Sequence, residues 1–444
     1  MIGVRRIMVI ITLCVGAFPG SRALQAQERP AAWDLAACID YATEHNINIR
    51  KSRISAESSE IDVKTAKANL FPNLSFSTGH NYVNRPLSED GAQKKNSYNG
   101  NYGLNVSWTV FDGGKNTKTV SREKLNRRIS ELNVTQNEND IEVSITQLYV
   151  QILYADESVK INESTLEVSE AQVNRAKELL AAGSIARSDY AQLEAQYSSD
   201  KYQLVNSLAT LQDYKLQLKQ LLELDGEEEI ELALPELNDD IVLTLLPAKS
   251  DIYRTALTFR PEIETGKLNI EASGLEIDIA RAGYMPTLSL SAGIGTNHTS
   301  GSDFTFGEQV KNGWNNSLGL TVSVPIFNNR QTKSTVQKAR LQYETSKLDM
   351  LNEEKTLYST IEGIWLDANT AQQRYAAAKE NLNSTQISYD LVSEQFTLGM
   401  KNTVELLTEK NNLLSTKQEL IQAKYMAILN MQLLNFYQGR EISL

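Results

Sequence analysis

The side chains that could perform covalent or metal chemistry are few and scattered along this chain of 444 residues. Gly113-Gly114-Lys115 lacks the glycine spacing of a phosphate-binding loop, and the sequence contains neither a Gly-x-Ser-x-Gly elbow nor a His-Glu-x-x-His motif. Of three histidines, His45 is remote, whereas His80 and His298 occupy similar late positions in two expected strands, which leaves a metal site open beside an ordinary loop-proximal role. We predict a protein that is not an enzyme, with no catalytic residue, no cofactor and no metal.

Four segments of the chain alternate apolar with small polar side chains, a pattern that determines what each face of a strand can contact. Side chains alternate across a strand, so each segment presents one apolar face and one wet face of Gly, Ser, Thr and Asn. This pattern, over about nine to eleven residues, is typical of strands that span a membrane. The strands are predicted at about 71–82, 101–111, 286–298 and 314–327.

The N-terminus predicts export from the cytoplasm. Two arginines precede an apolar run over residues 7–18, which is followed by a helix-breaking Pro-Gly and small residues. This is typical of a secretory signal peptide at 1–26, with cleavage after Ala23 or Ala26; an uncleaved signal anchor is the alternative. Cys14 lies inside the apolar run, which argues against a lipoprotein cleavage site.

Charge and cysteine content exclude further classes of function. The chain carries a net charge of −11, and removal of residues 1–26, with three arginines and no acid, gives −11 − 3 = −14. An acidic exported protein is a poor ligand for nucleic acid, so no nucleic-acid partner is expected. Only Cys38 then remains, so no intrachain disulfide is predicted.

The sequence contains an internal duplication. Phe71-Pro-Asn-Leu-Ser-Phe corresponds to Met285-Pro-Thr-Leu-Ser-Leu at an offset of 214 residues, and Phe111 corresponds to Phe327 at an offset of 216. A nearly constant offset over such distances indicates a repeat, and each half reads as helix, strand, loop, strand, long helix, turn and helix. The predicted divisions are a first structural repeat at 27–224, an equatorial connector at 225–249 and a second structural repeat at 250–444.

Long stretches without helix breakers follow each strand pair. Residues 115–182 contain neither Gly nor Pro, and residues 328–398 contain a single glycine. Helices of that length span roughly 100 Å. Each then meets Gly183 or Gly399, a usual left-handed helix stop, and returns as a shorter helix. The predicted helical hairpins lie at about 115–224 and 328–438.

The last helix carries leucines at seven-residue spacing, Leu406, Leu413 and Leu420, accompanied by a second apolar stripe. Seven-residue spacing is typical of coiled-coil packing, and the doubled stripe favours a helix with a neighbour on each side, as in a cylinder. The helices before the strands, at about 34–69 and 250–284, are too short to match the long helices. We expect them to stack end to end with the returning helices.

Four strands cannot close a barrel, and an open strand edge is not tolerated in lipid, so the chain must oligomerise. Two copies would leave a lumen filled by side chains, whereas the small wet-face residues favour the open bore of three copies. Aromatic residues near the strand ends are predicted to form the two interfacial girdles of a membrane barrel. These residues are Phe71, Tyr82, Tyr102, Phe111, Tyr284, Trp314 and Phe327.

In order and duplication, the motifs resemble those of the TolC-like outer-membrane efflux protein family over essentially the whole mature chain. The matching segments are Trp33-Asp-Leu-Ala-Ala-Cys, the strand entries Phe71-Pro-Asn-Leu and Met285-Pro-Thr-Leu, the strand exits Val110-Phe-Asp-Gly-Gly and Val324-Pro-Ile-Phe, and the tip turns Gly183-Ser-Ile-Ala-Arg-Ser-Asp-Tyr and Gly399-Met-Lys-Asn-Thr-Val-Glu-Leu. The resemblance implies an α+β membrane protein that forms a homotrimer. Each chain would give four strands to a twelve-stranded β-barrel in the lipid of a Gram-negative outer membrane, which continues as a twelve-helix α-barrel across the periplasm.

The resemblance also implies function. Such ducts passively conduct drugs, metal ions, metabolites or secreted proteins outward, with a periplasmic membrane-fusion adaptor and an inner-membrane RND or ABC pump. The alternative is a soluble periplasmic coiled-coil adaptor or structural protein, which would share the long hairpins but not the four alternating strands.

A periplasmic gate at the tip turns is the last implication of the resemblance. By position its charged residues are Asp189, Lys401 and Glu405, and Phe396 stands at the family's gate aromatic. The family pattern can carry a second acid three residues after Glu405, where this chain has Thr408. The alternative role of the two acids is that of ordinary carboxylates near helix N-termini, which the helix dipole favours.

Overall fold

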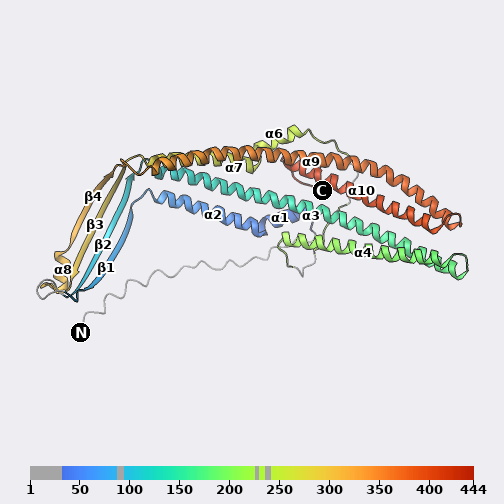
Figure 1. Cartoon of the computed structure of the whole chain (residues 1–444), viewed down its shortest axis with the longest axis horizontal. Coiled ribbons are helices and arrows are strands. Elements are labelled where there is room, and N and C mark those ends of the chain that lie inside the picture. The colour runs from blue at the N-terminus through green and yellow to red at the C-terminus, as the bar shows by residue number, and fades with distance from the viewer. Residues whose placement is uncertain (1–32, 88–94, 226–229, 236–241) are drawn as a thin grey trace.

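A computed structural model describes residues 33–87, 95–225, 230–235 and 242–444. The predicted signal peptide and part of the predicted connector lie outside the described residues. The molecule is long and narrow, with a sheet at one end and the turns of two helical hairpins at the other (Figure 1). We refer to these two ends as the sheet end and the tip end.

The first half of the chain runs from two short helices through a strand pair into a long hairpin. Its elements are α1 (Leu35–His45), α2 (Ile47–Ala68), β1 (Asn73–Asn84), β2 (Asn96–Phe111), α3 (Lys115–Ala181) and α4 (Arg187–Leu221). The second half repeats this order, with a short helix added between its strands. Its elements are α6 (Lys249–Phe259), α7 (Pro261–Ala282), β3 (Thr287–Thr299), α8 (Phe306–Asn312), β4 (Asn315–Ser323), α9 (Gln331–Thr397) and α10 (Thr403–Tyr437).

The two halves match element by element, which confirms the duplication. α3 and α9 have 67 residues each, and α4 and α10 have 35 each. The offset is 261 − 47 = 214 between α2 and α7, and 331 − 115 = 216 between α3 and α9. The second strand pair with its loop is therefore longer by the difference of these offsets, two residues.

Backbone conformation is duplicated as well. Left-handed backbone occurs at Gly113 and Gly114 before α3, and at the equivalent Asn329 and Arg330 before α9. The tip glycines form a second equivalent pair, and Glu223 and Gly439 form a third. The offset of 216 therefore holds for turn geometry in addition to helix length.

The strands form one antiparallel sheet in the order β1-β2-β3-β4, so β1 and β4 are its edges. Even-numbered residues pair with even-numbered residues along all three ladders, apart from one irregularity between Thr109 and Phe111. The apolar and wet faces of neighbouring strands are thus continuous.

Two strand boundaries differ from the predicted ones. β2 begins at Asn96, not near residue 101, because its ladder with β1 continues to the pair Asn84 and Asn96. β4 ends at Ser323, not near residue 327, because Pro325 has no N–H to give to the ladder.

The short helices expected at about 34–69 and 250–284 are each divided in two. Asn46 leaves the helical conformation, and its Oδ1 accepts hydrogen bonds from the first amides of α2. Arg260 breaks the second pair because it precedes Pro261, which disfavours helical backbone at the residue before it. The two breaks lie at equivalent positions, since 260 − 46 = 214.

The predicted end-to-end stacking is present at both breaks. Asn46 Nδ2 donates to the carbonyl of Leu221 at the end of α4, 3.0 Å away. The Arg260 guanidinium lies over the rings of Phe436 and Tyr437 at the end of α10, 4.7 and 5.0 Å from their centroids. α2 with α4, and α7 with α10, therefore form two composite columns beside α3 and α9 (Figure 1).

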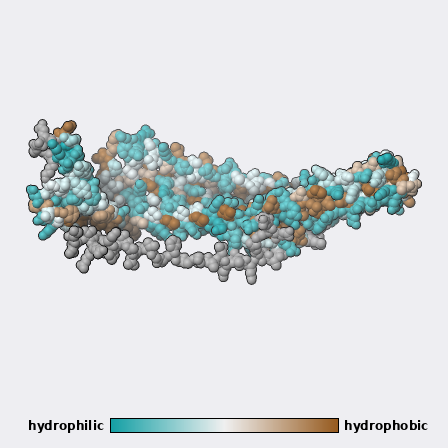
Figure 2. All heavy atoms as spheres, turned by 90° about the horizontal axis from the view of Figure 1, so that it is seen from below, coloured by the Kyte–Doolittle hydropathy of each residue, from teal (hydrophilic) through white to brown (hydrophobic). Residues whose placement is uncertain are grey.

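Each long helix has different neighbours in its two halves. Toward the sheet end, α3 packs against α2 and α7, and α7 packs against α9; toward the tip end, α3 packs against α4 and α10, and α10 packs against α9. The face of the rod seen in Figure 2 is mostly hydrophilic, with hydrophobic patches between. Among the helices of the described residues, none is apolar enough over a sufficient length to cross a bilayer.

The main apolar core lies at mid-length, where the columns meet. It is centred on Tyr149 and Ile145 of α3 and includes Leu218 of α4 and Ile428 of α10. The Tyr149 hydroxyl donates to the carbonyl of Ala233, in the described part of the connector. In the described part of the connector, Leu232 forms a parallel bridge with Trp33.

Candidate channel wall and periplasmic tip

The odd-numbered residues of the sheet form a wet face made of short side chains. A Cβ added to Gly293 would lie 2.9 Å from Ser317 Oγ, and one added to Gly319 would lie 2.8 Å from Ser291 Oγ. Glycine therefore leaves room for the serine on the facing strand. Such a face offers hydrogen-bonding groups and no bulk, which suits the wall of a water-filled passage.

The even-numbered residues form an apolar face that a single chain leaves uncovered. Leucine, valine, isoleucine and phenylalanine side chains on it are exposed, and the edge strands carry the most exposed ones, such as Leu318 at 78%. The apolar face of the sheet is therefore not covered by the chain's own core. This is the arrangement of a sheet whose outer face meets lipid.

The aromatic residues predicted to form girdles lie at the two ends of the sheet. Four lie at the helix side, Phe71, Phe111, Tyr284 and Phe327, and three lie at the loop side, Tyr82, Tyr102 and Trp314. All but the half-buried Tyr102 are exposed. Their place near the strand ends is what a girdle requires, and the girdle itself remains a prediction.

Sequence reasoning missed part of the loop-side cluster. The Tyr98 hydroxyl and His80 Nδ1 share a hydrogen bond of 2.9 Å, and Phe306 of α8 meets His298 edge to face at 5.0 Å. The two imidazoles flank Gly100, with centroids 6.5 Å apart. Among the described residues, no three His, Cys, Asp or Glu side chains gather as a metal site. Tyr98 was missed because it lies before the predicted strand start.

The two tip turns share one geometry. Gly183 and Gly399 have φ values of 71° and 74°, and a Cβ added to either would meet nothing within 4 Å. Glycine is therefore required by the backbone conformation and not by crowding. Ser184 and Met400 close the turns by donating to carbonyls five residues earlier, as in a Schellman motif.

The predicted gate residues of the second turn form a small closed network. Lys401 Nζ lies 2.5 Å from Glu405 Oε1. Glu405 Oε2 accepts from the Asn402 amide at 3.1 Å, and Asn402 Oδ1 accepts in return from the Glu405 amide at 2.9 Å. This is a capping box, and Glu405 thus combines the predicted charge with the alternative role of a helix-terminal carboxylate.

Glu405 is held in its ionised form. The hydrogen bond from Lys401 and then that from the Asn402 amide lower the pKa of its carboxyl below the ordinary value. Because the lowered pKa favours the carboxylate, the ion pair persists at neutral pH and is lost only in acid.

The other two predicted gate residues lie apart from this network. Asp189 is in the first turn of α4, on the other hairpin, and has no ion-pair partner among the described residues. Phe396 is half-buried in the last turn of α9, and its carbonyl accepts from the Gly399 amide at 3.0 Å. The single chain therefore joins Lys401 with Glu405 and joins neither of them with Asp189.

A buried ion pair behind the tip was missed by sequence reasoning. Lys410 Nζ of α10 lies 2.5 Å from Asp200 Oδ2 of α4. Lys410 also donates a hydrogen bond to the hydroxyl of Ser169 on α3, and that hydroxyl donates to Asp200 Oδ2. The exposed fractions are 4% for Lys410, 3% for Asp200 and 1% for Ser169. This cluster, which we call the inter-hairpin ion pair, joins the two hairpins.

A signal for the inter-hairpin ion pair was present in the sequence. Lys410 lies three residues before the stripe leucine Leu413, and Asp200 lies seven residues after the buried Leu193. Opposite charges at core positions of two helices predict a pair if the helices meet. The sequence does not show that α4 and α10 both contact α3 at one level.

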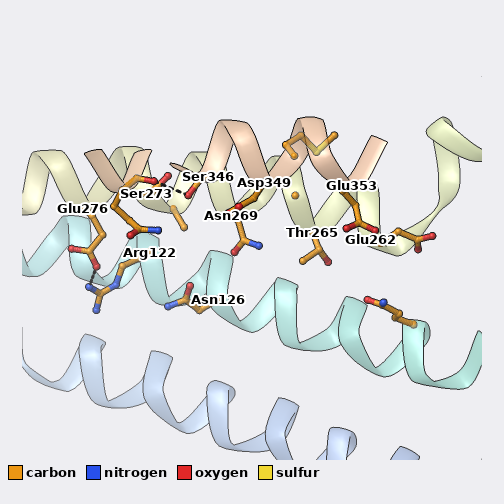
Figure 3. Close-up of a pocket in the computed structure, with 15 residues that line it drawn as sticks. Arg122, Asn126, Glu262, Thr265, Asn269, Ser273, Glu276, Ser346, Asp349 and Glu353 are labelled. Atoms are coloured by element: carbon orange, nitrogen blue, oxygen red, sulfur yellow. Dashed lines mark hydrogen bonds and ion pairs between the residues drawn. The ribbon is translucent and has the colours of Figure 1, made fainter. Parts of the chain in front are cut away.

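A polar pocket lies where the first repeat meets the second (Figure 3). It has a volume of about 520 Å³ between α3, α7 and α9, and its lining includes Glu262, Asp349 and Glu353. Arg122 of α3 pairs there with Glu276 of α7. The seam between the repeats is therefore polar near the sheet end and apolar at mid-length.

Comparison with known proteins connects these features. The family model for the outer membrane efflux protein matches residues 38–223 and 252–439, one segment in each repeat. The chain is 22% identical over 443 residues to the protease secretion protein PrtF of Dickeya chrysanthemi, covering 95% of this chain and 89% of that protein. It is 23% identical over 398 residues to the outer membrane protein TolC of Escherichia coli K12, covering 87% of this chain and 78% of TolC.

The same similarity holds in three dimensions. The crystal structure of the transmembrane channel CusC matches with a TM-score of 0.79 and 18% identity, over 94% of this chain and 96% of that chain. The fold is thus that of solved outer-membrane channels, and the family model covers both repeats. With its exposed apolar sheet face and its long helical hairpins, this chain belongs to the outer membrane efflux protein family and is an outer-membrane channel component.

Proposed function

We propose that three copies of this protein form one passive export duct, with a β-barrel in the outer membrane and a helical barrel in the periplasm. The observation that carries the proposal is a four-stranded sheet with an apolar outer face, a wet inner face and two unpaired edges. Lipid cannot satisfy unpaired strand edges, and three such sheets give twelve strands with room for an open bore. Four helices lie abreast in each half of the rod, so three chains supply twelve.

The cargo follows from the class of relative. The relatives include a protease secretion protein and the efflux protein family itself, so the proposed cargo is a small molecule or a secreted protein. As the resemblance to this family implies, we assign the driving force to an inner-membrane RND or ABC pump and the connection to a periplasmic adaptor at the tip turns.

The gate belongs to the same proposal. Lys401, Glu405 and Asp189 place charge at the tip end, where three copies would bring the turns together around the axis, and Phe396 stands just behind the second turn. Fixed charge in a narrow entrance raises the barrier to the passage of ions of the same sign. The gate rests on the carried-over positions and on the Lys401–Glu405 network.

Fractionation and native mass measurement test the proposal. The full-length protein, expressed in a Gram-negative host, is expected in the outer-membrane fraction, extractable only with detergent, with the mass of three mature chains. Reconstituted in planar bilayers, it is expected to give single-channel currents. Release by osmotic shock as a soluble protein would instead support the coiled-coil adaptor alternative and overturn the duct.

A further inference from the structure

The two edges of one chain present surfaces that its own fold leaves without a partner. On the sheet, Leu74 and Phe76 of β1 are 64% and 66% exposed, and Leu320 and Val322 of β4 are 66% and 60% exposed. The corresponding residues on the inner strands are less exposed, such as Leu104 at 40%. The edges therefore call for burial that a second copy of this chain can supply.

The internal duplication holds in the strand ladders themselves. Asn73 pairs with Ser107 in the first repeat, and their equivalents Thr287 and Ser323, at offsets of 214 and 216, pair in the second. β1 is therefore equivalent to β3, and β2 to β4, in register as well as in order. The ladder between β2 and β3 is the junction between repeats, where Ser107 pairs with Ser291.

We infer that the junction between neighbouring chains copies this junction between repeats. Moving the Ser107–Ser291 pair by one repeat assigns Ser323 of β4 to Ser77 of β1 in the next chain. The inference rests on the proposed trimer and adds the register of its closure. Every ladder of the barrel is then either a hairpin within a repeat or a copy of the β2–β3 junction.

Three features fit this register. It pairs even-numbered residues with even-numbered ones, so the apolar face continues from chain to chain, with Leu318 opposite Tyr82. It brings Asn84, the last residue of β1, opposite Asn316, beside the first residue of β4, so the two strands end together at the loop side. On the wet face it sets Gly79 against Thr321, which repeats the glycine-opposite-polar pattern of the inner ladders.

The helices show the same contrast as the strands: residues buried at the junction between repeats have exposed equivalents on the outer helices of the chain. Leu132 of α3 is 6% exposed, and in the same half of the rod α3 packs on α7. Its equivalent on α9, Leu348, is 66% exposed. On the opposite edge, Ile54 and Ile61 of α2 are exposed at seven-residue spacing, and their equivalents on α7 are half-buried. α9 of one chain thus packs against α2 of the next as α3 packs against α7.

Paired cysteines test the register. Ser77→Cys with Ser323→Cys replaces two small wet-face side chains by near-isosteric ones, and directly paired residues have Cα atoms about 4.5–5.5 Å apart, within disulfide range. Ser75→Cys with Ser323→Cys is the matched control, displaced by one pair along the same face, where the Cα separation of about 7–8 Å is too long. Native Cys38 is fully buried and stays in place.

After mild oxidation of the outer-membrane protein, the Ser77/Ser323 variant is expected to run as a covalent trimer on a non-reducing gel. The Ser75/Ser323 variant and the three single variants are expected to run as monomers. A native mass other than that of a trimer refutes the proposed assembly. A native trimer that crosslinks in the control variant, or in neither, leaves the assembly standing and overturns the register.

Discussion

Lys410 and Asp200 form an ion pair almost completely removed from water, 4% and 3% exposed, at a place where three helices meet. Removing charges from water is costly, and a buried pair is stabilised by its mutual attraction and by additional hydrogen bonds. Here Ser169 bonds both partners, and Gln196 Nε2 donates to Asp200 Oδ1 at 2.8 Å. Its equivalents at the offset of 216, Glu194 and Thr416, cannot form the same pair. Each chain therefore has one such ion pair, with its lysine on the second hairpin and its aspartate on the first, and no reciprocal pair at the equivalent positions.

Loss of one partner is expected to be far more damaging than loss of both. Lys410→Met leaves Asp200 buried without a counter-charge, which is expected to cost about 3–5 kcal/mol of stability. Lys410→Met combined with Asp200→Leu removes both charges and is expected to restore most of that loss. Thermal unfolding of the purified protein in detergent measures both. Equal midpoints for the single and double variants would contradict the pairing.

Lys401 and Glu405 provide the residue-level test of the gate. Lys401→Met with Glu405→Gln removes both charges, and glutamine can still serve the capping box, so the turn is expected to keep its shape. Single-channel conductance in planar bilayers is expected to rise because the charged constriction is lost. Glu60→Gln with Lys64→Met, an exposed pair of the same spacing on α2, is the matched control and should change nothing. Unchanged conductance in the tip variant would contradict the proposed gating role of Lys401 and Glu405.

Single residues differ in how well the sequence predicts them. Gly183 and Gly399 were predicted because a glycine between two breaker-free stretches has one common meaning, a left-handed helix stop. The inter-hairpin ion pair was not, because each of its charges looks like an ordinary coiled-coil position until the neighbouring helix is known. Tyr98 was missed for a different reason, the underestimated length of β2.

At the scale of elements, the junction between strand and long helix has an asymmetry that can be measured. Gly113 and Gly114 both have left-handed backbone, with φ values of 72° and 83°. A Cβ added to Gly113 would lie 2.6 Å from the Cβ of Met285, whereas one added to Gly114 would lie 3.6 Å from a threonine hydroxyl. A residue with a Cβ would therefore meet the left-handed backbone penalty at both positions, but the steric clash only at position 113.

Alanine at these two sites is therefore expected to act unequally. Gly114→Ala should cost roughly 1–2 kcal/mol for left-handed backbone. Gly113→Ala should cost that amount and about 1–3 kcal/mol more for the forced contact with Met285. Equal losses for the two alanine variants would refute the contribution of the Met285 contact.

In the second repeat, Arg330 adopts the same left-handed conformation at a φ of 65°. Arg330→Gly is therefore expected to raise the unfolding midpoint.

Long elements were predicted better than their interruptions. α3 and α9 were evident because nothing in their sequence stops a helix. The break at Asn46 was missed because asparagine inside an apolar-periodic stretch is only weakly unfavourable, and here its side chain caps α2 and bonds the end of α4. α8 was missed because a seven-residue helix leaves too short a pattern.

At the scale of the whole molecule, the duplication and the four strands could be predicted because both leave periodic marks in the sequence. The strand order is partly local, since β1–β2 and β3–β4 are hairpins. The β2–β3 ladder joins residues almost two hundred positions apart, and no local pattern specifies its register. The ladder forms where α3, which follows β2, packs against α7, which precedes β3, and the sequence alone does not show that contact.

The breaks at Asn46 and Arg260 have a mechanical consequence. α3 and α9 run unbroken from the sheet to the tips, whereas the columns α2 with α4 and α7 with α10 are jointed at mid-length. In the proposed trimer, rigid struts therefore alternate with jointed staves around the whole circumference. Under a torque applied at the tips, we expect the unbroken struts to resist bending and the joints to let the staves shear, so that the deformation is greatest in the half of the wall that carries the tips.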